Sequence, residues 1–213
     1  MKNTSIHPAG TPAVQDLQGA SMLRGALGLA ALALAGCGFL YSLAGVGLGQ
    51  ALFPEQAEGS MIVRDGKLAG SALVAQPFGG PGYFQARPSA ANYDPMALAG
   101  SNAARTNPDM RKRLEETRAA IAAREGVAVE TVPSDLATQS GGGIDPHISP
   151  QAARIQMARV ARERKLAPEE VARLVEQHTE APQFGLLGQP RVNVLALNLA
   201  LDRAGAPRNP ANS

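Results

Sequence analysis

The longest apolar pattern in the chain runs from Gly25 to Phe53 and contains no charged residue over 29 positions, counted from 25 to 53 inclusive. Arg24 stands directly before it, and Glu55 follows it closely. A helix needs about 20 apolar residues to cross a hydrocarbon core of about 30 Å, and it satisfies its own backbone groups in lipid. The pattern therefore predicts one transmembrane helix over residues 25–53.

The chain after this helix begins with a strand pattern. Two apolar runs, 61–63 and 68–74, flank the pair Asp65-Gly66, which is a strong hairpin signal. Residues 76–108 are then rich in Gly, Pro and Asn, so they predict an irregular segment that is either ordered or mobile.

Three helices are predicted next, at residue types that cap or open helices. One begins at Asn107-Pro108 and ends near Gly126, a second begins at Ser149-Pro150, and a third begins at Pro168. The predicted inward-facing residues of the three are Met110, Leu114, Thr117 and Ile121, then Ala153, Met157 and Val160, then Val171, Leu174, Val175 and His178.

The remaining positions complete an α+β domain. The four arginines of the second helix, Arg154, Arg159, Arg162 and Arg164, are expected on its solvated side. Residues 192–201 begin as a strand, and 196–201 fit a strand or a helix equally well. The predicted architecture is one N-terminal transmembrane helix followed by a single α+β extracytoplasmic domain over residues 54–213.

Composition excludes several classes of function. Lys and Arg total 20 against 18 Asp and Glu, so the formal charge is only +2, and aromatic residues make up 4% with no Trp. Neither a polycationic surface nor a base-stacking platform is available, so nucleic acid is not an expected partner. The single Cys37 excludes an internal disulfide and a multi-thiolate metal site, and no metal site is expected.

Small residues recur along the apolar segment at steps of three and four. Such spacing places them on one face of an α-helix, where small side chains let another helix approach closely. The stripe consists of Gly28, Ala31, Ala35, Gly38, Ser42, Gly45 and Gly49, and the residues proposed for a subunit interface are Gly38, Ser42, Gly45 and Gly49.

A second interpretation of this segment is an export signal. The sequence Leu34-Ala35-Gly36-Cys37 fits a lipoprotein signal, in which Cys37 would carry the lipid anchor. The apolar run continues well past Cys37 to Phe53, whereas a mature lipoprotein would turn polar there. The pattern favours a retained helix.

Catalytic motifs are scarce. Asp145-Pro146-His147 brings a carboxylate and an imidazole together, but no further His or Cys lies nearby, so a hydrogen-bonded turn is favoured over acid-base or metal chemistry. Ser140, Gly141, Gly142 and Gly143 could hold a phosphate through backbone N–H groups, although the Lys and Ser/Thr of a P-loop are missing. No catalytic residue is assigned.

Spaced sequence blocks resemble the C subunits of Kdp-type high-affinity potassium-transporting ATPases. The resemblance covers nearly all of residues 59–202, and the single N-terminal span matches that family as well. The blocks that carry it are Gly70-Ser71, Gln76, Phe78, Pro81, Tyr83-Phe84, Arg87-Pro88-Ser89-Ala90, Tyr93, Gly100-Ser101-Asn102, Thr106-Asn107-Pro108, Val132 to Leu136, Gly143 to Pro150, Pro190 to Leu195 and Leu197 to Asp202.

The resemblance implies an accessory subunit of an ATP-driven potassium uptake complex. Its implied partners are a channel-like potassium-binding subunit, a P-type ATPase subunit and a small single-span subunit. Two roles follow for such a subunit: assembly and stabilisation of the pump, or a catalytic chaperone that raises the ATP affinity of the ATPase subunit. A lipid-anchored exported enzyme using Asp145 and His147 is the third interpretation.

The expected topology is single-pass in the inner membrane. Arg24 precedes the span while Glu55 and Glu58 follow it, so residues 1–24 are expected in the cytoplasm and the domain outside it. In this topology the domain cannot reach cytoplasmic ATP, which favours assembly and stabilisation over the chaperone role. No cofactor is expected to bind directly, and ATP would act through the complex.

Overall fold

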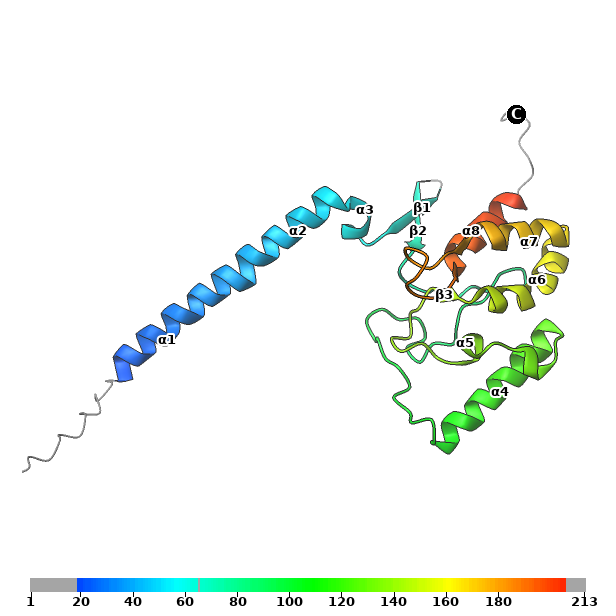
Figure 1. Cartoon of the computed structure of the whole chain (residues 1–213), viewed down its shortest axis with the longest axis horizontal. Coiled ribbons are helices and arrows are strands. Elements are labelled where there is room, and N and C mark those ends of the chain that lie inside the picture. Colours follow the sequence, from blue (N-terminus) through cyan, green and yellow to red (C-terminus); the bar gives the residue numbers. More distant parts are fainter. Residues whose placement is uncertain (1–18, 65, 206–213) are drawn as a thin grey trace, which may run out of the picture. The chain divides into compact units, whose positions relative to one another are not determined.

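The computed structural model describes residues 19–64 and 66–205 and divides the chain into two compact units, Met1–Ala57 and Glu58–Ser213 (Figure 1). The predicted cytoplasmic tail lies mostly outside the described residues, as does Asp65 of the predicted turn.

The first unit is an apolar helix followed by one short turn of helix. It consists of α1 (Gly19–Ala33), a π-helical segment η1 (Leu34–Leu40), α2 (Tyr41–Leu52) and α3 (Pro54–Ala57), and Figure 1 shows α1 and α2 as one uninterrupted rod. Residues Ser21–Leu52 are long and apolar enough to span a membrane, and none of their most apolar window is buried within the protein. The predicted helix is confirmed as a candidate span, and it begins before Arg24.

The π-helical segment changes which residues share one face of the helix before and after it. The N–H of Tyr41 donates to the carbonyl of Gly36, five residues earlier, instead of to the residue four earlier. One extra residue per turn offsets the faces on either side by roughly 100°. The small stripe predicted from Gly28 to Gly49 is therefore not continuous, whereas Ser42, Gly45 and Gly49 still share one face of α2.

The second unit begins with the predicted hairpin. Strands β1 (Met61–Arg64) and β2 (Lys67–Ser71) pair antiparallel, with a bulge between Ile62 and Val63. The prediction of two strands around Asp65-Gly66 is confirmed, although β2 ends at Ser71 instead of residue 74.

Five α-helices, one short 3-10 helix and three short strands form the rest of the described domain. A small antiparallel sheet has the order β3-β5-β4, with Ile148 opposite Val192 and Thr179 opposite Val192 on the other side. Figure 1 shows α6, α7 and α8 gathered at one end of this unit and α4 at the other. The elements are α4 (Pro108–Glu125), η2 (Val129–Thr131), α5 (Ser134–Ala137), β3 (His147–Ile148), α6 (Pro150–Arg164), α7 (Pro168–Gln177), β4 (Thr179–Glu180), β5 (Arg191–Asn193) and α8 (Val194–Ala204). The α+β class is confirmed.

Side-chain caps set the helix boundaries. Asn107 Oδ1 accepts from the N–H groups of Asp109 and Met110, and Gly126 ends α4 in the left-handed conformation at φ 68°. Asn193 Oδ1 accepts from Ala196 N–H at 3.1 Å. This cap decides between strand and helix for residues 196–201. The strand ends at Asn193, and the helix begins directly after it.

The core is built from small and aliphatic side chains around one aromatic ring. Phe84 is fully buried, and the only other aromatic residue packed against the core within the described range is the half-buried Phe78. The largest buried aliphatic residues of this core are Ile121, Val132, Leu136, Ile148, Val160, Val171, Val175, Val192, Val194, Leu197 and Leu201.

The segment between β2 and α4 contains no helix or strand, as predicted, and it is ordered by side chains of the helices. Asn198 pairs with the backbone of Phe84 in both directions at 2.9 Å, donating to its carbonyl and accepting from its N–H. Gln156 does the same for Gln85, at 2.8 Å and 3.2 Å. Two side-chain amides thus take the place of a neighbouring strand.

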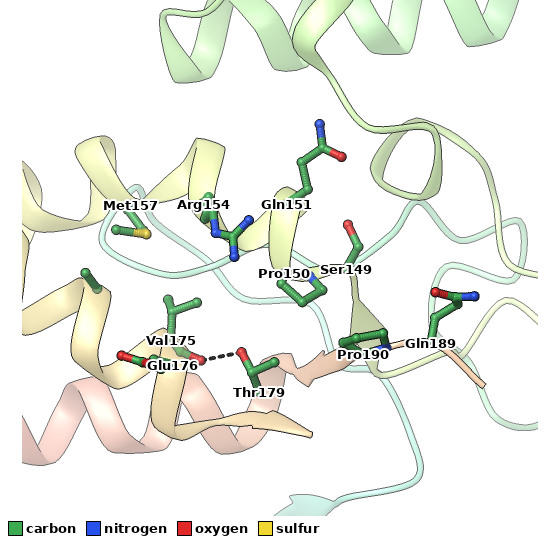
Figure 2. A pocket seen from close by; sticks show the side chains of 11 residues that line it. Ser149, Pro150, Gln151, Arg154, Met157, Val175, Glu176, Thr179, Gln189 and Pro190 are labelled. Carbon is green, nitrogen blue, oxygen red and sulfur yellow. Dashed lines mark hydrogen bonds between the residues drawn. The ribbon is translucent and has the colours of Figure 1, made fainter. Parts of the chain in front are cut away.

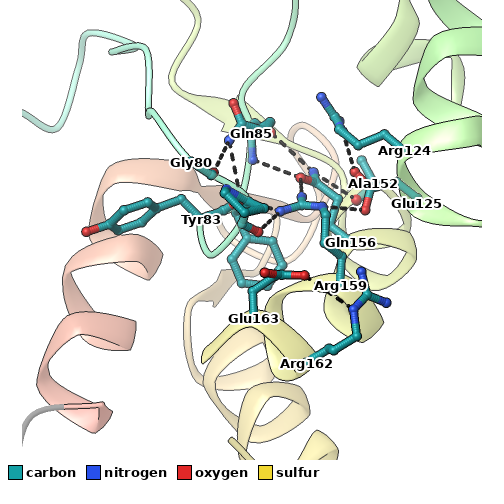
Figure 3. A network of polar contacts seen from close by, with 12 residues as sticks. Gly80, Tyr83, Gln85, Arg124, Glu125, Ala152, Gln156, Arg159, Arg162 and Glu163 are labelled. Carbon is teal, nitrogen blue, oxygen red and sulfur yellow. Dashed lines mark hydrogen bonds and ion pairs between the residues drawn. The ribbon is translucent and has the colours of Figure 1, made fainter. Parts of the chain in front are cut away.

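Arg159 lies in the interior, so its expected position on the solvated side of the helix is wrong. Its side chain is 4% exposed and forms an ion pair with Glu125 at 2.9 Å, whose side chain is fully buried (Figure 3). It also donates to the carbonyls of Pro81 and Tyr83. A buried guanidinium requires a carboxylate partner and several acceptors, and the irregular segment supplies the acceptors.

We expect Arg159→Met to lower the free energy of unfolding by about 3 kcal/mol, because it leaves the buried Glu125 with Arg124 as its remaining partner. Urea titration of the full chain in detergent, followed by circular dichroism, measures this loss. Arg162→Met is the matched control, because Arg162 lies on the same helix with its side chain 69% exposed and should cost about 0.5 kcal/mol or less. Equal losses in the two variants would contradict the structural role of Arg159.

Candidate functional site

Asp145 and His147 form a hydrogen-bonded turn. Asp145 Oδ1 accepts from the N–H of His147 at 3.0 Å and lies 3.4 Å from its Nδ1, while Asp145 Oδ2 accepts from Arg87 at 2.7 Å. Both oxygens of the Asp145 carboxylate are therefore engaged in contacts within the protein. Among residues 19–64 and 66–205, no group of three His, Cys, Asp or Glu side chains could hold a metal ion.

Arg87 joins segments that lie far apart in the sequence. Besides Asp145, it donates to the carbonyl of Asp135 at 3.1 Å and to Thr138 Oγ1 at 3.3 Å. Asp135 in turn accepts from the backbone N–H and the hydroxyl of Ser149, the residue that caps α6. These residues, except Thr138, belong to the resembling blocks. No signal in the sequence indicated that they meet, because the contacts between Arg87 and Asp145 and between Asp135 and Ser149 span 58 and 14 residues.

The environment of Asp145 changes its acidity. Burial raises the pKa of Asp145, but hydrogen bonds from His147 and Arg87, together with the charge of Arg87, outweigh burial and lower this pKa to about 2. The carboxylate is therefore held in its ionised form, which suits a structural ion pair and not a general acid.

The glycine segment proposed for phosphate binding packs partly against the irregular loop. Ser140 is buried, and Gly143 has φ 77° with a position for Cβ only 2.8 Å from the Cβ of Ala91. Only glycine fits there. Gly141 and Gly142 are exposed, and a Cβ on either would meet nothing within 4 Å. Phosphate binding by this segment stays a prediction.

A second polar cluster surrounds Asp202 at the end of α8. Its carboxylate accepts from Arg64 at 2.7 Å, Arg164 at 2.8 Å and the hydroxyl of Tyr83 at 3.0 Å. Burial raises the pKa of Asp202, but hydrogen bonds from these residues, with the charge of Arg164, leave the pKa below its usual range. The cluster ties the hairpin, the irregular loop, α6 and α8 together.

A cleft of about 860 Å³ opens between α6 and α7 (Figure 2). Its two hydroxyl groups are engaged, since Ser149 caps α6 and Thr179 donates to the carbonyl of Val175 at 2.7 Å. No histidine or cysteine lines it. The lining residues are Ser149, Pro150, Gln151, Arg154, Met157, Ala172, Val175, Glu176, Thr179, Gln189 and Pro190. This surface can bind, but it contains no nucleophile paired with a base.

The blocks that carry the family resemblance contact one another and residues next to them in the sequence. Ser89 donates to the carbonyl of Gly143, and Asn193 donates to the carbonyl of Ala72 at 2.8 Å. The N–H of Ala75 donates to the carbonyl of Ile144 at 2.8 Å. The blocks therefore take part in one framework of hydrogen bonds.

The family model of K+-transporting ATPase c chains, KdpC, matches residues 23–203. The chain belongs to this family. The resemblance drawn from the sequence is thereby confirmed.

Curated relatives agree with this membership. The chain is 60% identical over 183 residues to the potassium-transporting ATPase KdpC subunit of Xanthomonas oryzae pv. oryzae, covering 86% of this chain and 88% of the relative. Identity to the same subunit of Xanthomonas axonopodis pv. citri is 60% over 185 residues, covering 86% and 90%. The KdpC subunit of Variovorax paradoxus is 48% identical over 191 residues, covering 88% and 99%. These relatives are subunits of a complex and not stand-alone enzymes.

We expect Asp145→Asn to make unfolding less dependent on pH. Because the folded pKa lies below its unfolded value near 3.9, the carboxylate stabilises the fold above about pH 4, and this contribution is lost as pH falls from about 4 to about 2. The variant should be less stable by about 1–2 kcal/mol at pH 7, a figure reduced for partial exposure, and should equal the parent near pH 2.

Urea titrations of the two proteins between pH 2 and pH 7 measure this difference. Glu115→Gln removes a carboxylate from an exposed position of α4 and serves as the control. A constant difference between the Asp145 variant and the parent across this range would contradict an ionised, paired Asp145.

Proposed function

We propose that the chain is a non-catalytic accessory subunit that assembles and stabilises an ATP-driven potassium uptake complex. Its family, the c chains of K+-transporting ATPases, supports the complex. The observation that supports assembly is the helix Ser21–Leu52, whose apolar side chains are not covered by any other part of residues 19–64 and 66–205. Such a helix needs lipid and neighbouring helices around it.

The proposed partners in the membrane are the channel-like potassium-binding subunit, the P-type ATPase subunit and the small single-span subunit. The contact is assigned to the face of α2 that carries Ser42, Gly45 and Gly49, with Gly38 in the preceding π-helical segment. A Cβ added at Gly45 would meet nothing within 4 Å, so this position is open to an approaching helix.

The proposed topology is a single pass through the inner membrane with the α+β domain outside the cytoplasm. Arg24 lies near the first end of the helix, whereas Glu55 and Glu58 follow the other end. Positive charge is retained on the cytoplasmic side more often than negative charge. This orientation separates the domain from cytoplasmic ATP.

A second candidate is a catalytic chaperone that raises the ATP affinity of the ATPase subunit. The exposed backbone at Gly141 and Gly142 is the feature that favours it, because free N–H groups in glycine loops bind phosphates. It requires the domain to lie in the cytoplasm. The third candidate, a lipid-anchored enzyme, requires cleavage before Cys37, within a helix that continues to Leu52.

We expect Gly45→Leu to reduce co-purification of the chain with the other subunits in detergent by roughly tenfold, because a large side chain would keep the neighbouring helix away. Gly47→Leu is the matched control, since Gly47 lies about 200° away on the same helix and its Cβ position is equally open. Affinity purification of the complex through a tag on the ATPase subunit measures both. Equal recovery of the two variants would count against this face.

The topology predicts that protease added to intact spheroplasts digests the domain and leaves the apolar helix protected. Immunoblotting with tags on either end of the chain follows the fragments. Protection of the domain until the membrane is permeabilised would place it in the cytoplasm and favour the chaperone role.

A further inference from the structure

A short loop of the domain exposes three large apolar side chains together. Phe184 is 84% exposed, Leu186 86% and Leu187 62%. We call residues 184–187 the apolar tip. No charged residue occurs from Ala181 to Pro190, so the tip lies within a ten-residue uncharged stretch, counted from 181 to 190 inclusive.

Hydrogen bonds within the turn pair several backbone groups of the apolar tip. Gln183 and Leu187 exchange N–H to carbonyl bonds at 2.8 Å and 2.9 Å, Gly185 donates to Pro182 at 2.9 Å, and Leu186 donates to Gln183 at 3.2 Å. Polar backbone groups are costly in hydrocarbon unless they are paired internally. The N–H groups of Gly185, Leu186 and Leu187 can therefore leave water while they keep these hydrogen bonds.

Packing within the domain does not explain why the apolar side chains of the tip are held in this conformation. Phe184 holds a left-handed backbone conformation at φ 56°, which is unfavourable for a bulky residue, and yet its ring lies in solvent. The ion pair between Glu180 and Arg191 at 2.8 Å lies at the base of the loop. Charge thus stops where the apolar stretch begins, a division typical of segments that enter an interface with lipid.

The tip is connected to the end of the domain where the membrane helix joins it. Ala72 donates to the carbonyl of Ser60 at 2.9 Å, and Asn193 of β5 donates to the carbonyl of Ala72. Leu187 lies six residues before Asn193, a reach of at most roughly 20 Å. The tip is therefore within roughly 30 Å of Ser60.

The tether between the helix and the domain is short. Eight residues, 53–60, separate the end of α2 from β1, and they can span at most roughly 29 Å. The tip can therefore lie no farther than roughly 60 Å from the end of α2 along this path. This argument holds for either orientation of the chain in the membrane.

The small exposed apolar area of the tip favours a lipid bilayer over a protein as its partner. Three side chains of this size expose on the order of 400 Å², whereas each side of a stable, specific protein interface buries about 800 Å². The tip also lacks a charged group that could select a protein partner. Insertion into a bilayer needs neither a large area nor a specific partner.

We propose that the apolar tip, Phe184 to Leu187, inserts into the bilayer surface as a second membrane contact of this chain. The proposal rests on retention of the N-terminal helix in the membrane. It assigns the tip to the boundary between headgroups and acyl chains, where it limits the rotation of the domain about its tether.

The chain contains no tryptophan, so Phe184→Trp introduces a single reporter at an aromatic position. The full chain is reconstituted into vesicles of phosphatidylcholine and phosphatidylglycerol with ordinary or brominated acyl chains. We expect brominated lipid to lower the emission of Trp at 184 roughly twofold or more, because insertion by about 5–10 Å brings the ring to the acyl chains. Met96→Trp is the control, since Met96 is 92% exposed in another loop, and it should not be quenched by bromine.

A second variant tests the mechanism. Leu186→Asp in the Phe184→Trp background should abolish quenching by brominated lipid while leaving the fold unchanged, because Leu186 makes no buried contact. Quenching that survives this charge would overturn the proposal.

The remaining outcomes distinguish a lipid contact of the tip from a protein contact and from failure of the N-terminal helix to anchor the chain. Trp at 184 that is as accessible to aqueous acrylamide as Trp at 96 overturns the proposal. Shielding that occurs only with the other subunits present, without quenching by bromine, overturns it in favour of a protein contact. A chain that floats with vesicles but keeps the tip in water contradicts the tip alone, whereas a chain that does not float contradicts both the tip and the anchor.

Discussion

Buried backbone groups of the irregular segment between β2 and α4 need hydrogen-bond partners, and side chains of α6 and α8 supply them. Gln156 and Asn198 each pair with a backbone N–H and a carbonyl of this segment. Arg159 adds two contacts to carbonyls and is itself neutralised by Glu125. Because Phe84 can fill the core only when its segment is held in this way, the packing of the domain depends on these three polar side chains.

The residues of the family resemblance play a similar part, because they too are polar side chains that hold distant segments together. Arg87, Asp135, Asp145, Asn193 and Asp202 all belong to the resembling blocks, and each holds together segments that are distant in the sequence. Their chemistry is that of ion pairs and caps, with both shifted carboxyl pKa values displaced toward the ionised form. The blocks therefore identify the fold, and the function follows from membership of the family and not from a reaction centre.

Local signals predicted most of the elements, and long-range contacts produced the differences. Asn107, Gly126 and Ser149 marked helix ends because caps act within one turn. The burial of Arg159 could not be predicted, because its partner Glu125 lies 34 residues away. Strands β3, β4 and β5 have two or three residues each, too few for alternation to be detected. Asn193 before an apolar run was a usable signal for the start of α8.

The domain and the N-terminal helix differ in the groups they leave available to a partner. In residues 19–64 and 66–205, Nε of Arg118 is the one buried side-chain nitrogen or oxygen without a hydrogen-bond partner, so the interior of the domain leaves little polar capacity for a ligand. The helix, by contrast, exposes its apolar side chains throughout. Apolar surface drives association with lipid without selecting a partner, whereas small residues such as Gly45 allow close approach of only those helices that fit. In the proposed function, selectivity for the pump is therefore assigned to the small face of α2, because the apolar side chains of the helix do not discriminate between partners.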